Sequence, residues 1–149
     1  MRTTLTAAAL ATAAALTIAG CGSKPATITA HGTLDVFASP LGGQSVQTAY
    51  PDITSGSQVT IKNPGGSVVG TGTLVTDAAA TAAADAQMAA AVPGTSPSTY
   101  SAWVEAFTFT AKVPGGLSRY GITIGSHGTI WFTLGEMRKG PTLSLGNMG

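Results

Sequence analysis

Residues 58–75 read QVTIKNPGGSVVGTGTLV, and this stretch is the strongest indication of the fold class. Polar and apolar residues alternate over residues 58–62, which is the pattern of a half-buried strand. In the turn that follows, Pro64 presets the first turn position and Gly65 can adopt a positive φ without strain. Residues 67–75 return as a second strand, so the sequence predicts a β-hairpin.

Similar short runs lie on both sides of the hairpin, separated by glycine, proline and asparagine. Leu34 and Val36 share one alternating register, and Phe107 and Phe109 share another. Together the predicted strands cover residues 27–37, 58–62, 67–75, 100–110, 120–124, 128–134 and 141–145. Seven short strands with glycine-rich turns predict an all-β fold, either an antiparallel β-sandwich or a small barrel.

Two segments depart from the β pattern. Residues 38–57 contain several turn signals and predict a long loop. Residues 76–98 form an alanine-rich insert, which predicts either a helix over residues 78–91 or a loop. The sequence leaves the choice between helix and loop open, because alanine favours a helix but offers little apolar area to bury.

Aromatic residues are few, at 6% of the chain. An exposed aromatic platform could stack against sugars, and the candidates for it are Trp103, Phe107, Phe109, Trp131 and Phe132. In a chain this poor in aromatic residues, burial in the core is the favoured prediction.

The amino terminus follows a different pattern. Arg2 precedes an uncharged stretch over residues 5–18, and residues 18–21 read IAGC. A basic start, an apolar run and small residues before a cut are typical of a secretory signal peptide. The apolar run is too short and too rich in threonine for a membrane span, which needs roughly 20 apolar residues.

The tetrapeptide IAGC resembles the lipobox of bacterial lipoproteins. The resemblance implies that residues 1–20 are removed and that the thiol of Cys21 carries a diacylglycerol, which holds the protein on the extracytoplasmic face of the cell membrane. Cys21 is the only cysteine, so no intramolecular disulfide can form. Residues 21–26 are then the lipidated cysteine and a short tether, and residues 27–149 are a single β domain that contains the insert.

The charge balance argues against one class of partner. The chain carries seven basic and six acidic residues, and six of each remain without residues 1–20. A neutral chain with 9% charged residues has no basic excess for phosphates, so nucleic acid is not an expected partner. The richness in threonine, alanine and glycine resembles the composition of actinobacterial proteins.

Two further segments resemble uncharacterised small exported proteins of actinobacteria. That group carries a Tyr-x-Asp-Ile segment, a Gly-x-Gln-Val-Thr-Val strand and a late Tyr-x-Ile-x-Ile strand followed by glycine. The matching residues are Tyr50, Asp52, Ile53, Gly56, Gln58, Val59, Thr60, Ile61, Tyr120, Ile122, Ile124 and Gly128. The resemblance implies a shared fold and no particular activity.

The two histidines occur in the same tripeptide, His-Gly-Thr, at His31 and His127. If their strands paired, the imidazoles could form a metal site with Asp35 or Asp52, as a small hydrolase or metal carrier would need. Zinc sites usually contain ligands that lie only a few residues apart in the sequence, together with identifiable third and fourth ligands. Ordinary strand histidines are therefore the favoured interpretation, and no metal or cofactor is predicted.

Nucleophile and carboxylate motifs are also weak. Gly-x-Ser-x-Gly is absent, and the six acidic residues show no spacing that selects a pair. Ser126 adjoins His127, but neighbours on a strand point to opposite faces, which argues against a catalytic pair. The sequence therefore predicts a protein that is not an enzyme.

The favoured function is a membrane-anchored, non-enzymatic lipoprotein that binds another cell-envelope component through residues 38–57 or 76–98. One alternative is a phage- or host-encoded superinfection-exclusion lipoprotein that blocks DNA injection. Another is the hydrolase or metal carrier that uses His31 and His127.

Overall fold

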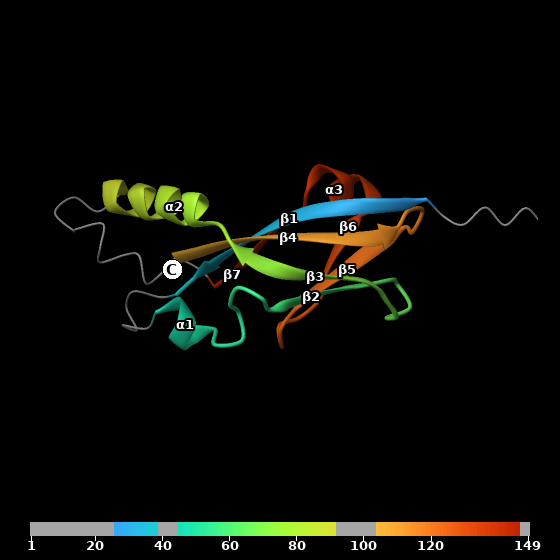
Figure 1. Cartoon of the computed structure of the whole chain (residues 1–149), viewed down its shortest axis with the longest axis horizontal. Coiled ribbons are helices and arrows are strands. Elements are labelled where there is room, and N and C mark those ends of the chain that lie inside the picture. Colours follow the sequence, from blue (N-terminus) through green and yellow to red (C-terminus); the bar gives the residue numbers. More distant parts are fainter. Residues whose placement is uncertain (1–25, 39–44, 92–103, 147–149) are drawn as a thin grey trace, which may run out of the picture.

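The computed structural model describes residues 26–38, 45–91 and 104–146. These residues form seven strands and three helices (Figure 1). In chain order they are β1 (Thr27–Phe37), α1 (Val46–Ala49), β2 (Gln58–Lys62), β3 (Val68–Thr76), α2 (Ala78–Ala91), β4 (Val104–Pro114), β5 (Arg119–Ile124), β6 (Ile130–Thr133), α3 (Leu134–Lys139) and β7 (Thr142–Leu145). The all-β prediction with about seven strands is confirmed.

The strands form one sheet in the order β6-β5-β2-β3-β4-β1-β7, curled into a half-barrel. All neighbours are antiparallel except β1 and β7, which pair in parallel from Thr33 opposite Thr142 to Val36 opposite Leu145. The sheet is therefore mixed at one edge. The predicted hairpin over residues 58–75 is β2 and β3.

Strand β3 joins the two halves of the curled sheet. Its first part pairs with β2, and its last three residues pair with β4. In the part that pairs with β2, a Cβ on Gly70 or Gly72 would lie 2.6 Å from the carbonyl oxygen of Lys112 or Thr110, respectively. These two glycines let β3 pass close to the backbone of β4, which closes the curl of the sheet.

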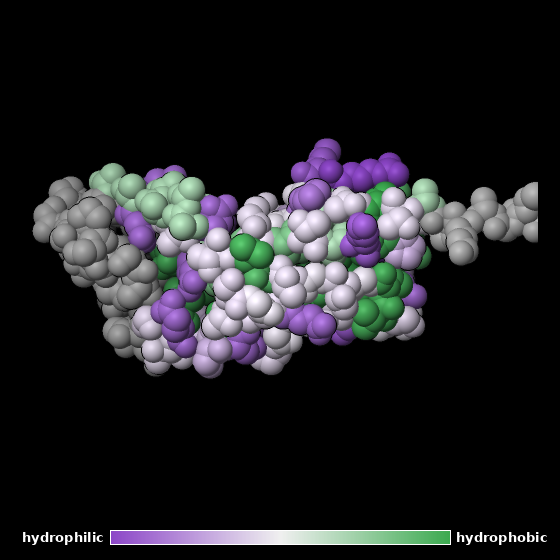
Figure 2. Space-filling model, in the orientation of Figure 1, coloured by the Kyte–Doolittle hydropathy of each residue, from purple (hydrophilic) through white to green (hydrophobic). Residues whose placement is uncertain are grey.

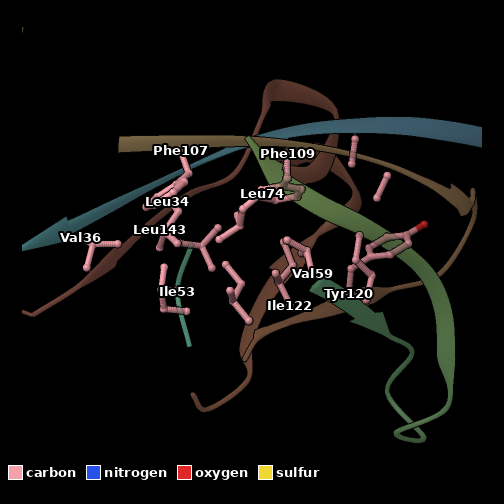
Figure 3. Close-up of a cluster of buried hydrophobic side chains, with 14 of the residues drawn as sticks. Leu34, Val36, Ile53, Val59, Leu74, Phe107, Phe109, Tyr120, Ile122 and Leu143 are labelled. Carbon is pink, nitrogen blue, oxygen red and sulfur yellow. The ribbon is translucent and has the colours of Figure 1, made fainter. Parts of the chain in front are cut away.

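The core fills the concave side of the sheet, where Leu34, Leu74, Phe107 and Phe109 point toward Ile122 (Figure 3). The buried core residues of the described chain run from Ala30 to Leu143: Ala30, Leu34, Val36, Ala38, Val46, Ile53, Val59, Ile61, Leu74, Phe107, Phe109, Ala111, Val113, Tyr120, Ile122, Ile124, Met137 and Leu143. Burial of the valine, leucine, isoleucine, phenylalanine and methionine side chains among them stabilises by roughly 1.5–3 kcal/mol each.

Helix α3 lies between the two edge strands β6 and β7 and was not predicted. The side chain of Thr133 accepts a hydrogen bond from the Glu136 amide, while Glu136 accepts one from the Thr133 amide, which is a capping box. The helix places Met137 in the core at 1% exposure. Strand pairing thus ends at Thr133, one residue before the predicted end of that strand.

The alanine-rich insert is helical over Ala78–Ala91, which is the first of its two predicted forms, and residues 92–98 lie outside the described part of the chain. Asp77 accepts a hydrogen bond from the Ala80 amide at the start of α2. The hydroxyl of Thr81 accepts one from the Ala106 amide at 2.9 Å, which ties the helix to β4. Val104 and Ala106 of β4 are buried at 1% and 3% exposure.

Some aromatic predictions fail and others hold. Phe107 and Phe109 are core residues at 1% and 2% exposure. Trp131 is 39% exposed, so its predicted burial is wrong. It lies on the edge strand β6, opposite Gly121 of β5, where the missing side chain leaves room for the indole on the sheet surface. Trp103 lies outside the described residues.

Candidate functional site

One polar cluster joins the loop before β2 to the turn after β5. Asp52 Oδ2 accepts hydrogen bonds from the amide and the hydroxyl of Ser126, both at 2.9 Å. His127 Nε2 lies 3.3 Å from Asp52 Oδ1. The rings of Tyr50 and His127 pack at a centroid separation of 5.6 Å. The cluster brings together residues 74 positions apart in the chain.

The hydrogen bonds stabilise the ionised form of Asp52. The amide and then the hydroxyl of Ser126 lower the pKa of this carboxyl from 3.8 to about 2, and His127 contributes a smaller part. Gly125 has φ +53°, and a Cβ there would overlap Asp52 Oδ2. The approach of the carboxylate thus depends on glycine in the turn.

The order of these contacts decides what the cluster can do. In a serine hydrolase the imidazole lies between the carboxylate and the hydroxyl, so that it can take the serine proton. Here the Asp52 carboxylate lies between Ser126 and His127. A carboxylate with a pKa near 2 is a poor base at neutral pH. The arrangement is therefore suited to holding the two loops together.

The expectation that Ser126 and His127 point to opposite faces of a strand is wrong. Strand β5 ends at Ile124, and both residues lie in the turn that follows. In a turn, successive side chains are not held to alternate faces. Both therefore reach the same carboxylate.

His31 has different surroundings. It lies on β1, opposite Thr110, and its Nδ1 is 3.0 Å from the Thr110 hydroxyl. The sheet order separates β1 from β5, so the strand pairing that would bring the two histidines together does not occur. Within the described residues no group of three metal-ligating side chains is found.

A surface cavity of about 280 Å³ lies beside α2. Two acidic residues line it, Asp85 from α2 and Glu105 from β4, together with Gln47 from α1. Gln47 donates a hydrogen bond of 2.8 Å to Glu105, whereas the buried Asp85 Oδ1 has no partner among the described residues. Burial raises the pKa of both carboxyls, and the Gln47 hydrogen bond partly offsets this for Glu105.

A second hollow, of about 210 Å³, lies on the outer surface near the β2–β3 turn. It is lined by Pro64, Arg119 and Trp131. The exposed indole therefore shares a surface site with a guanidinium group, a combination that the sequence did not indicate.

The charged residues are segregated along the molecule. The basic residues of the described chain are Lys62, Lys112, Arg119, Arg138 and Lys139, and they lie toward the end where β1 begins and where α3 and the β2–β3 turn lie (Figure 1). Five acidic residues lie toward the opposite end, near α1, α2 and the end of β1: Asp35, Asp52, Asp77, Asp85 and Glu105. Glu136 in α3 is the acidic exception among the described residues. We call these the basic end and the acidic end.

Cys21 and the predicted signal peptide lie outside the described residues. In the part of the chain that is described, no helix is both long and apolar enough to cross a membrane. Comparison of the chain with protein-family models, with curated proteins and with solved structures finds no match in any of the three.

Proposed function

We propose that the protein is an exported lipoprotein, anchored to the membrane through Cys21, whose β domain binds another protein of the cell envelope without catalysing a reaction. The anchor proposal rests on the sequence IAGC at residues 18–21 behind an uncharged stretch.

The acidic end supports the binding proposal. Five carboxylates gather there, and the cavity between α2 and β4 holds two of them with raised pKa. The single observation that carries the proposal is the buried Asp85 Oδ1, which has no hydrogen-bond partner among the described residues. Buried polar atoms are normally paired, and the surface cavity that Asp85 lines gives a donor from a partner access to this carboxylate. The complementary partner surface is basic.

Photocrosslinking in living cells tests this proposal. We place a photoreactive amino acid at Gln87, which is exposed on α2, and in a separate variant at Thr71, which is exposed on β3. We expect one discrete adduct from position 87 and none from position 71. The substitution Asp85→Lys in the position-87 variant should abolish the adduct because it reverses the charge in the cavity.

Equal crosslinking from positions 71 and 87 would contradict a binding surface at the acidic end. An adduct that survives Asp85→Lys in a folded protein would remove the role given to this carboxylate. The identity of the adduct separates the general proposal from superinfection exclusion, for which the partner is a channel or phage tail protein.

A further inference from the structure

The basic end contains all five lysine and arginine residues of the described chain. Lys62 is partly exposed, and the other four are exposed: Lys112, Arg119, Arg138 and Lys139. Glu136 lies among them, and its pKa is lowered mainly by hydrogen bonds within its capping box, with smaller contributions from Arg119 and Lys139. With one carboxylate against five cations, this end is positively charged although the whole domain is nearly neutral.

The separation of charge is large enough to act locally. Lys112 and Glu105 are seven residues apart along β4, which corresponds to about 23 Å at the usual rise of a strand. The Debye length at physiological ionic strength is only about 8 Å. A surface near the basic end therefore experiences the cations and is screened from the carboxylates at the acidic end.

The chain enters the domain at this same end. The Gly115 amide, in the β4–β5 turn, donates a hydrogen bond to the Ala26 carbonyl oxygen, so the start of β1 is fixed beside that turn. From Cys21 to Thr27 is six residue steps, which span at most about 20 Å when fully extended. An acyl group on Cys21 would hold the basic end within that distance of the bilayer.

Apolar side chains accompany the cations. Val68, next to the β2–β3 turn, is 57% exposed, and Trp131 is 39% exposed beside Arg119. Tryptophan is favoured at membrane interfaces because its ring is amphipathic. Figure 2 shows hydrophilic residues gathered over α3 at the same end. Cations beside exposed apolar groups form a surface of mixed character that suits an interface between water and lipid headgroups.

We propose that the basic end docks on the surface of a bilayer that contains anionic phospholipid, with Arg119, Arg138 and Lys139 on the headgroup phosphates and Trp131 in the interface. This proposal rests on the anchoring at Cys21 proposed above, which supplies the proximity. It fixes the orientation of the domain: the acidic end faces away from the membrane, toward its partner.

Vesicle flotation tests the docking without the acyl chain. The non-acylated chain from residue 21 onward is mixed with vesicles of phosphatidylcholine containing 30% phosphatidylglycerol, a composition of about one-third anionic lipid, or of phosphatidylcholine alone. We expect binding to the anionic vesicles only, weakened by 0.5 M salt, which shortens the Debye length to well under 8 Å. The triple substitution Arg119→Gln, Arg138→Gln, Lys139→Gln should weaken binding by on the order of a hundredfold.

A matched control separates local from overall charge. The triple substitution Ala79→Glu, Ala86→Glu, Gln87→Glu changes the net charge by the same amount on exposed positions of α2, and should weaken binding by less than about threefold. In a Trp103→Phe background, Trp131 is the only tryptophan, and its emission should shift to shorter wavelength on anionic vesicles. The basic-end variant should lose that shift.

Equal weakening by the two triple variants, or no binding to anionic vesicles by a folded protein, would overturn the proposal. Binding of soluble polyphosphate without binding to vesicles would overturn it in favour of a soluble polyanion. Because this experiment uses a chain without acyl groups, its failure leaves lipidation at Cys21 intact, and failure of lipidation leaves the vesicle result intact.

Discussion

Replacing Asp52 by asparagine removes the charge that joins the loop before β2 to the turn after β5. Asparagine has nearly the same shape, and its single carbonyl oxygen can still accept a hydrogen bond from Ser126. The substitution therefore tests the charged form of the contact. It leaves Gly125 and the close approach of the two loops unchanged.

The expected loss follows from the pKa of Asp52. Its fall from 3.8 to about 2 corresponds to an upper limit of about 2.4 kcal/mol at neutral pH. The Asp52 side chain is 37% exposed, and solvent screening of such a group reduces the effect. We expect Asp52→Asn to lower the free energy of unfolding by about 1 kcal/mol at pH 7.

The same pKa predicts how the effect depends on pH. Because the carboxyl of Asp52 has a lowered pKa in the folded state, its contribution is fully present above 3.8 and is lost as the pH falls through about 2. The difference between the original protein and Asp52→Asn should therefore be constant from pH 7 to about 5 and shrink toward zero near pH 2.

Urea denaturation of the chain from residue 21 onward, followed by circular dichroism at several pH values, measures this difference. Ser126→Ala alone and combined with Asp52→Asn completes a double-mutant cycle, for which we expect a coupling of about 0.5–1 kcal/mol. An unchanged free energy of unfolding at pH 7, or a deficit that persists undiminished at pH 2, would refute the reasoning.

Three further substitutions, one of them a control, test packing and burial. Gly72→Ala should lower the free energy of unfolding by about 1–3 kcal/mol, because its Cβ would lie 2.6 Å from the Thr110 carbonyl oxygen. The control Gly128→Ala has open space at the Cβ and should lower it by less than about 0.5 kcal/mol. Equal losses in thermal melts would contradict the close approach of β3 and β4. Asp85→Asn should raise the free energy of unfolding at pH 7 by less than about 1 kcal/mol, because burial raises the pKa of Asp85 and its charge therefore reduces stability as the pH rises above 3.8. The gain should disappear near pH 3, and a loss of stability at pH 7 would show that the charged form is favoured in the fold.

Local patterns predicted the elements of the fold that form from neighbouring residues. The hairpin over residues 58–75 combines clean alternation with a Pro-Gly turn, and it is observed as β2 and β3. Helix α3 was predictable in principle, because Thr133 and Glu136 have the spacing of a capping box. The apolar run IWF before it favoured a longer strand instead.

Contacts between distant segments left no such signal. The parallel pairing of β1 with β7 joins residues more than 100 positions apart, and no residue type specifies it. Asp52 and Ser126 meet because β5 pairs with β2, which places the end of β5 beside the loop before β2. The basic end could not be predicted from the net charge either, because composition gives the number of cations and not their positions.

Labelling with radioactive palmitate in the bacterial host tests the central claim, attachment through Cys21, most directly. We expect the original protein to incorporate label and to lose residues 1–20, and Ser23→Ala, a control two residues further on, to do the same. Cys21→Ala should incorporate no label and accumulate as the uncleaved precursor. Label that persists in Cys21→Ala, or an original protein that remains unlabelled, would contradict the account.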